Sequence, residues 1–345
     1  MTTTSLAPIG LVMAAIMTIS NVLTDVARKH ALTGRDLIPV TFWIRTAVTL
    51  CVGVVLLWRI ANGAEVVIRD GGPLFGIESV HLTPIPTFLI YLLLNVLLIS
   101  GVTLLYFKAL QITPLSMCVP FLSFTPVFLI PTGFVILGEV PAPLKAVGVA
   151  LIVIGSLVMH RRLFAEGLMA PVKAVLREKG SRYMLLVSFI FSITNPLDKK
   201  LVTMSDVFVE AFSYGLGLAI AFWIMGRARK GDFKAAARAN SKWIFLAGLL
   251  DAIALLFQLA SYSYIPVVIT VSIKRAGIVL SVFSGWLFFR ERDITDRIIA
   301  ASVMFCGVLI LYLPLSATET ALVAVLTVTG MSVALYATRH EKVPA

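Results

Sequence analysis

The sequence predicts an all-α integral membrane protein with two inverted five-helix repeats, which form a ten-helix core, and an eleventh helix at the C-terminus. Three observations lead to this fold class. Hydrophobic residues make up 59% of the 345 residues and charged residues only 14%, which is far from the composition of a soluble domain. Apolar segments of membrane-spanning length recur along the chain. The two halves of the chain also match each other at particular residues.

The apolar segments set the number of expected helices. A helix needs about 20 mainly apolar residues to cross a bilayer core of roughly 30 Å. Segments of this kind lie at residues 7–27, 37–58, 86–110, 113–137, 143–159, 183–203, 207–226, 243–263, 266–289, 297–315 and 320–337.

Residue types that bind metals or cofactors are sparse and scattered. Cys51, Cys118 and Cys306 lie in apolar segments, which argues against a disulfide framework and against a metal site. The chain has no Walker loop, Gly-rich dinucleotide turn or HExxH motif. Its net charge of +11 lies on loops between spans rather than on one nucleic-acid-binding face. We therefore expect no cofactor, no metal and no nucleic-acid partner.

Basic residues are distributed unequally between the loops. Most of the 29 Lys and Arg residues follow odd-numbered spans or lie at the C-terminus. Lys- and Arg-rich loops mark the cytoplasmic side, so the pattern favours an N-terminus outside and a C-terminus inside. The expected location is the bacterial inner (plasma) membrane. The loops after even-numbered spans hold Arg59, Arg69, Lys145, Lys199 and Lys200.

The two halves of the chain form an internal repeat. Near the start of each half, Ile19-Ser20-Asn21 matches Ile193-Thr194-Asn195. The spacing between this match and the later ones is longer in the first half, and the extra residues fit in the loop at 60–85. The matches include Pro and Gly residues rather than only Leu and Val, which argues against chance similarity between apolar helices. Without a gap, Pro114 aligns with Pro266, Gly133 with Gly285, Glu139 with Glu291 and Gly155 with Gly307.

An odd number of spans per half makes the second copy enter the membrane in the opposite sense. Inverted repeats of this kind place substrate sites at the repeat interface near the midplane of the bilayer. The expected divisions are a first repeat at 7–159, a basic linker at 160–182, a second repeat at 183–315 and an extra C-terminal transmembrane segment at 320–337.

The repeat resembles the EamA-like carriers of the drug/metabolite transporter superfamily, which have ten helices in two five-helix halves. Residues 106–159 and 265–311 carry the resemblance, which extends over residues 7–315. Its features are a Pro-rich fourth helix, Gly-Glu or Arg-Glu at a helix end, and a Gly in the following helix. The resemblance implies a solute carrier with a central cavity that works by alternating access without ATP. The family usually keeps its N-terminus in the cytoplasm, which the charge pattern opposes.

Basic residues within the spans are the first candidates for solute binding, because a charge at the bilayer centre costs about 2.5 kcal/mol or more. Lys274 and Arg275 lie in "SIKR" and Lys199 and Lys200 in "DKK". Both motifs are similar to pairs in plant triose-phosphate translocators, which implies contact with an anionic group. Arg pairs bidentately with carboxylate or phosphate, and Lys adds a compact charge. The alternatives are internal ion pairs and, for the lysines near a helix end, snorkelling to the interface.

Five other polar residues in the spans are candidates to line the same site. Arg45 either braces the fold or touches the solute. Asn21 and Asn195 are equivalent in the repeat, and Gln258 and Tyr262 share one helical face. The alternative for the Asn residues is hydrogen bonding between helices, and for Tyr262 it is anchoring at the membrane interface.

Prolines in the fourth span are candidates for gating, because broken helices supply hinges and binding backbone in transporters. We expect this role for Pro120 or Pro126, although Pro is also tolerated in membrane helices without any function. Glu139 and Glu291 end the fourth and ninth helices and are expected to be structural. The sequence names no group that couples transport to a proton.

The function expected from these features is secondary active transport of a small organic solute that bears phosphate or carboxylate. The alternative is a flippase for a lipid-linked or lipid phosphate. A receptor would need a sizeable soluble domain, and a membrane enzyme would need reactive side chains clustered at one depth; the sequence indicates neither. The expected partners are the solute, membrane lipid and a second copy in a homodimer.

Overall fold

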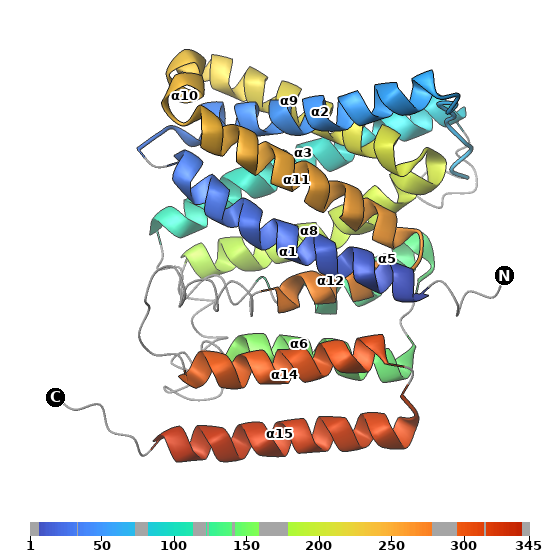
Figure 1. The fold of residues 1–345 in the computed structure, drawn as a ribbon, viewed down its shortest axis with the longest axis vertical. Coiled ribbons are helices and arrows are strands. Elements are labelled where there is room, and N and C mark those ends of the chain that lie inside the picture. The colour runs from blue at the N-terminus through green and yellow to red at the C-terminus, as the bar shows by residue number, and fades with distance from the viewer. Residues whose placement is uncertain are drawn as a thin grey trace. The chain divides into compact units, whose positions relative to one another are not determined.

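The computed structural model describes residues 7–32, 34–72, 82–112, 122, 124–139, 142–158, 179–277, 295–313 and 315–339. These residues form helices and no strands (Figure 1). The helices are α1 (Ala7–Leu32), α2 (Leu37–Ala61), α3 (Pro84–Ile112), α5 (Thr125–Leu137), α6 (Pro143–Val158), α8 (Lys179–Met204), α9 (Val207–Ala228), α10 (Phe233–Ala239), α11 (Ser241–Tyr262), α12 (Val267–Ala276), α14 (Thr295–Tyr312) and α15 (Ala317–Arg339).

Each predicted span overlaps one of these helices, and the predicted all-α membrane fold is confirmed. Five helices in the described part of the chain are long and apolar enough to cross a membrane, namely α1, α2, α3, α9 and α11. Shorter apolar stretches lie in α5, α6 and α15. The short helix α10 was not predicted. It begins after Asp232, whose carboxylate accepts from the Ala235 amide at 2.8 Å and so caps the helix.

The helices group into two compact units, and each unit draws helices from both sequence repeats. Unit 1 comprises Met1–Thr103 and Ile193–Ile265, and unit 2 comprises Leu104–Ser192 and Pro266–Ala345. The chain passes between the units within α3, within α8 and between α11 and α12.

Within unit 1, α1 packs along α11, and α2 packs against both α9 and α11 (Figure 1). Small residues permit the close approach: a Cβ on Gly215 of α9 would lie 2.9 Å from the Thr49 hydroxyl of α2. Small residues are the usual way in which membrane helices pack closely. The end of the bundle near α10 is filled by Ala27, Ala31, Val40, Ile44, Ala236, Ile244 and Ala247.

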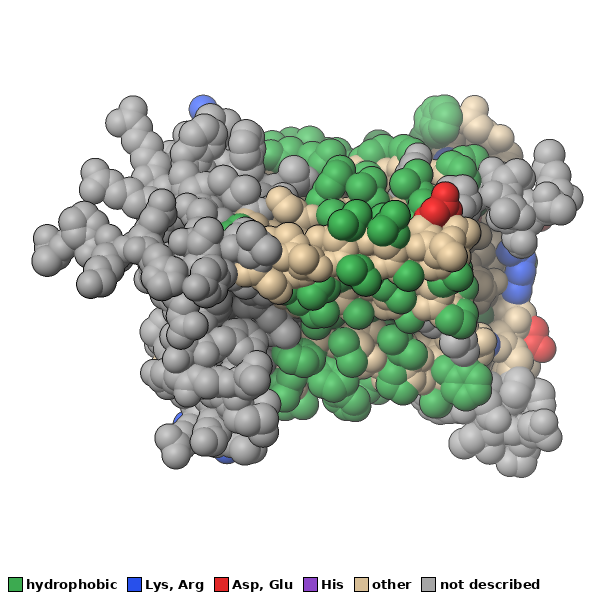
Figure 2. Space-filling view, turned by 90° about the horizontal axis from the view of Figure 1, so that it is seen from below, with side chains coloured by type: hydrophobic (Ala, Val, Ile, Leu, Met, Phe, Trp, Pro, Cys, Tyr) green, Lys and Arg blue, Asp and Glu red, His purple; other side chains and the backbone are tan. Residues whose placement is uncertain are grey.

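Within unit 2, α6 packs along α14, α5 along α12, and α15 along α14 (Figure 1). The Lys145 ammonium donates to the carbonyl oxygens of Ile310 and Leu313 at 2.8 Å each and so satisfies the C-terminal end of α14. Figure 2 shows the face of this unit that carries α15: hydrophobic side chains fill its middle, and the charged side chains drawn there lie toward the ends. Such a face suits contact with lipid. Exposed apolar residues of α15 include Leu322, Val325, Leu326 and Val328.

The helix pairs fit an inverted repeat. The second helix of the first repeat, α2, packs on its equivalent α9, and the fourth and fifth, α5 and α6, pack on their equivalents α12 and α14. Packing of an element against its own repeat equivalent is the arrangement that a twofold axis between two repeats would produce. Inverted repeats are related by an axis of this kind in the membrane plane.

Gly307 of α14 lies against the backbone of α6, which leads to a stability prediction. A Cβ there would lie 2.8 Å from the Gly148 carbonyl oxygen and 3.1 Å from the Ile152 backbone nitrogen. Because backbone atoms cannot move aside cheaply, we expect Gly307→Ala to lower the free energy of unfolding by about 1–3 kcal/mol. Thermal unfolding in detergent measures this loss.

The matched control is Gly101→Ala in α3, where a new Cβ meets no atom within 4 Å. Alanine favours a helix over glycine by roughly 0.5–1 kcal/mol, so Gly101→Ala should unfold at or slightly above the wild-type temperature. Equal destabilisation by both substitutions would show that packing of α14 on α6 is not the cause.

Candidate functional site

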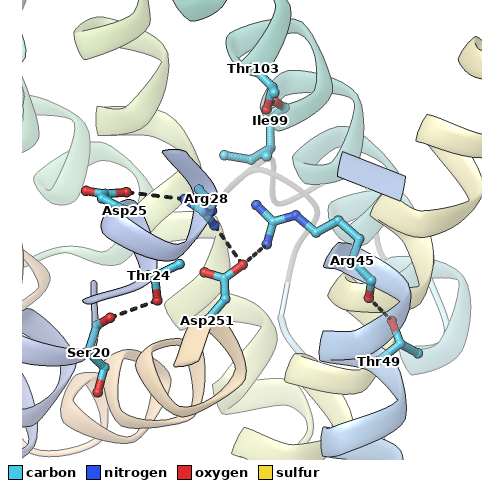
Figure 3. Close-up of polar contacts among 9 residues, drawn as sticks. All are labelled: Ser20, Thr24, Asp25, Arg28, Arg45, Thr49, Ile99, Thr103 and Asp251. Carbon is cyan, nitrogen blue, oxygen red and sulfur yellow. Dashed lines mark hydrogen bonds and ion pairs between the residues drawn. The ribbon is translucent and has the colours of Figure 1, made fainter. Parts of the chain in front are cut away.

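Arg45 of α2 lies in an ion-pair cluster with two other helices of unit 1. The Asp251 carboxylate of α11 is 2.8 Å from the guanidinium of Arg45 and 2.8 Å from that of Arg28 in α1. Arg28 also lies 3.6 Å from Asp25, one turn earlier in α1. Figure 3 shows Asp251 between the two guanidinium groups. The Arg45 and Asp251 side chains are only 15% and 11% exposed, and the cluster joins α1, α2 and α11. The ion pairs agree with the bracing alternative for Arg45, and contact with the solute stays a prediction.

Asn195, Gln258 and Tyr262 form a buried triad in unit 1. The Asn195 side-chain oxygen accepts from the Tyr262 hydroxyl at 3.0 Å and from the Gln258 amide at 3.4 Å. The Gln258 amide also lies 2.9 Å from the Tyr262 hydroxyl. Tyr262 is 0% exposed, which rules out the interface anchor that its place near a helix end indicated. The structure thus unites three of the predicted residues and connects α8 to α11.

Asn21 makes its hydrogen bond within its own helix. Its amide donates to the Met17 carbonyl oxygen at 2.9 Å, one turn earlier in α1. The two Asn residues that the repeat makes equivalent therefore differ, because the bonds of Asn195 cross to α11. A solute-binding role for Asn21 stays a prediction.

Lys199 and Lys200 are half-buried near the C-terminal end of α8. The Lys199 ammonium lies 3.4 Å from the Ile265 carbonyl oxygen, which follows the end of α11. A cation is stabilised near the carbonyl end of a helix. Contact of Lys199 and Lys200 with an anionic solute stays a prediction.

Arg275 of α12 contacts a hydroxyl group and an aromatic ring in unit 2. Its guanidinium donates to the Thr125 hydroxyl at 3.1 Å and lies 5.7 Å from the centre of the Phe191 ring. The Thr125 hydroxyl donates to the Leu122 carbonyl oxygen and is 3.0 Å from the Ser188 hydroxyl. A hydroxyl has one donor and two acceptor positions, so Thr125 accepts from both Ser188 and Arg275. The contacts with Thr125 and Phe191 orient the guanidinium.

Lys274 precedes Arg275 in the last turn of α12, and both side chains are half-buried. Consecutive residues of a helix point about 100° apart, so the two bases leave α12 in different directions. The N-terminus of the same helix is fixed by Glu139, whose carboxylate accepts from the Val267 amide at 3.2 Å. This contact is the structural role expected for Glu139, because a carboxylate stabilises the amide end of a helix.

Of the two prolines predicted to act in gating, the structure describes only Pro126. Pro126 is buried in the first turn of α5, where a missing amide costs nothing and the helix is not bent. Pro120 lies outside the described residues, as does Glu291.

Pro196 lies inside α8 and leaves the Ser192 carbonyl without its helical donor. The Thr132 hydroxyl of α5 donates to that carbonyl at 2.7 Å instead.

Sequence reasoning missed Thr125, Ser188 and Phe191 as neighbours of Arg275. Hydroxyl and aromatic residues are common in membrane helices, so nothing in the pattern marks these three. Asn95, in "LLLNVLL", gave a clearer signal, since it is a lone amide in an apolar run. It donates to the carboxylate of Asp198, and both residues are buried.

Comparison with known proteins agrees with this fold. The family model of the EamA-like transporter family matches residues 8–161 and 178–313. A solved structure named "Crystal structure of protein" has a TM-score of 0.62 at 14% identity, and the match covers 89% of this chain and 96% of that chain. At this identity the likeness concerns the fold alone. No curated protein matches the chain.

The family match spans both repeats and most of the chain. It does not extend to the triose-phosphate translocators, so that similarity stays a prediction. Together with the apolar helices it makes this an integral, multi-pass membrane protein that transports a small molecule. The chain therefore belongs to the EamA-like transporter family.

Proposed function

We propose that the protein is a secondary transporter of a small organic solute that bears phosphate or carboxylate, and that it works by alternating access. The observation that carries the proposal is the placement of Arg275 in α12, with Lys274 beside it. The guanidinium is half-buried in an apolar helix, and a hydroxyl and an aromatic ring hold it in place.

The chemistry of this arrangement favours an anion. A guanidinium that is fixed by its neighbours loses little side-chain entropy when it pairs with a second partner, and its planar fork matches carboxylate and phosphate. Ion pairs strengthen as water is excluded.

Uptake into proteoliposomes tests the proposal. Radiolabelled carboxylates and sugar phosphates are compared with cationic and neutral solutes, first with the wild-type protein and then with Lys274→Ala and Arg275→Ala. We expect the wild type to accumulate at least one anion, and both variants to lose most of that uptake because the anion has lost a positive partner.

Lys234→Ala is the matched control, because this lysine is exposed on α10 and its loss should leave uptake unchanged. Uptake of only cationic or neutral solutes would contradict the proposal, and so would wild-type affinity in both variants. Movement of a lipid phosphate between leaflets in place of soluble anions would favour the flippase alternative.

Orientation is a separate proposal. The basic loops favour a C-terminus inside the inner membrane. A C-terminal fusion to a reporter that is active only in the cytoplasm should therefore be active. A reporter that works only outside the cytoplasm and gives signal at the same position would contradict the orientation or the eleventh span.

A further inference from the structure

Glu210, in the first turn of α9, is a buried carboxyl group that the transport site described above does not use. It is 0% exposed, and within the described part of the chain neither carboxylate oxygen has a hydrogen-bond partner. The N-terminal amides of α9 are already occupied, since Asp206 accepts from the amides of Phe208 and Val209. Glu210 therefore gains no hydrogen bond from the end of its own helix.

A second carboxyl group acts on Glu210 from α8. Asp198 is buried, and its charge bears directly on Glu210. The Asn95 amide of α3 donates to Asp198, which stabilises the ionised form of that residue. The pair is therefore asymmetric: Asp198 has a donor that suits a carboxylate, and Glu210 has none.

The remaining charged and titratable neighbours do not supply a cation to Glu210. Tyr214, one turn further along α9, interacts with Glu210, Asp198, Arg45 and Asp251. Arg45 of α2 points its guanidinium to Asp251 of α11 at 2.8 Å.

Arg59, at the far end of α2, is paired with Asp206 at 3.2 Å, and Asp206 caps α9. Lys199 reaches the Ile265 carbonyl oxygen. The basic groups that the structure shows in this part of unit 1 are thus directed to other partners.

Two carboxyl groups in such surroundings hold at least one proton between them. An ionised carboxylate that is buried without hydrogen bonds costs several kcal/mol, and such a group takes up a proton instead. Like charges that share a site do not both ionise readily. With Asn95 donating to Asp198, the proton belongs on Glu210.

We propose that Glu210 is the proton-binding site that couples solute movement to protons. The step is a reversible proton transfer: the Glu210 carboxylate takes one proton from water and becomes a neutral carboxylic acid, with no change in oxidation state. A carrier couples solute movement to proton movement when a buried carboxyl group must be protonated for one of its conformations to form. The proposal deepens the proposed transport function and rests on it for its physiological meaning, but proton binding is measurable without any solute.

Infrared difference spectroscopy tests proton binding on the purified, full-length protein. Spectra at low and high pH should differ by the carbonyl stretch of a buried carboxylic acid. We expect Glu210→Gln to lose this band, and Glu65→Gln, at an exposed position, to keep it. Asp198→Asn should also keep the band. Absence of the band from the wild type, its survival in Glu210→Gln, or its loss in Asp198→Asn alone would overturn the proposal.

Proteoliposomes that contain a trapped pH-sensitive dye test coupling, with the membrane potential clamped by potassium and valinomycin. Addition of the transported anion from the uptake panel should move protons with the wild type. Glu210→Gln should abolish this movement while exchange of labelled for unlabelled solute continues, because Gln mimics the protonated side chain. Proton movement at the wild-type level in Glu210→Gln would overturn the proposal. Failure of the anion panel alone would count against the proposed substrate and leave the infrared test intact.

Discussion

Asp251→Ala should lower the free energy of unfolding by about 3–5 kcal/mol. The substitution leaves the guanidinium groups of Arg28 and Arg45 facing each other without the carboxylate that lies 2.8 Å from both. Removal of one partner from a buried ion pair costs more than the pair itself contributes, because the remaining charge stays buried. Thermal or denaturant unfolding in detergent measures the loss.

The control for Asp251→Ala is Glu65→Ala, which removes an exposed acidic side chain and should change stability by less than about 0.5 kcal/mol. Replacement of the whole cluster, with Arg28→Met, Arg45→Met and Asp251→Leu together, should recover most of the loss because no buried charge remains. Wild-type stability of Asp251→Ala would show that the cluster does not brace α1, α2 and α11.

Arg275→Ala should weaken binding of the carried anion by about 2–5 kcal/mol, or roughly 30-fold or more in Kd. Arg275→Lys keeps the charge but loses the planar fork that the Thr125 hydroxyl and the Phe191 ring hold in place. Because Arg and Lys are not interchangeable at such a position, Arg275→Lys should fall between the wild type and Arg275→Ala. Isothermal titration calorimetry on the purified protein measures all three.

Thr125→Val separates positioning from charge. It removes the hydroxyl that accepts from Arg275 but leaves both bases in place. We expect weaker binding than in the wild type and stronger binding than in Arg275→Ala. If Arg275→Lys and Thr125→Val both bind as tightly as the wild type, the geometry of the guanidinium is irrelevant to the anion.

The sequence predicted the helices and the repeat because hydrophobic length and punctuating residues are local properties. Each expected span overlaps a helix of the described residues, and the fold class is confirmed. The short helix α10 was not predicted because its seven residues lie in a basic loop and are too few to show a helical pattern of apolar residues. Its capping residue, Asp232, was the available signal.

The partners of the charged residues could not be predicted. Arg45 and Asp251 are 206 residues apart, and each had several possible partners until the packing of α2 on α11 was known. The grouping of helices into units was equally hidden, since each unit combines parts of both repeats. An alignment of the repeats shows which helices are equivalent but not which of them pack together.

A single polar residue in an apolar segment can indicate a functional group as well as an ion pair. Glu210 in "VFVEAF" is one such residue, and its carboxylate has no hydrogen-bond partner among the described residues. A buried carboxylate is costly, and either a bound proton or a neighbouring cation can neutralise it. Burial and hydrogen bonding decide between the two, and both depend on tertiary structure.

The most direct test of the central claim is equilibrium binding of a carboxylate solute and of its neutral amide to the same purified protein. The wild type should bind the carboxylate much more tightly than the amide, and Arg275→Ala should discriminate far less between the two, because the carboxylate has then lost one of its two positive partners. Equal binding of carboxylate and amide by the wild type, or undiminished discrimination in Arg275→Ala, would contradict an anion site at α12.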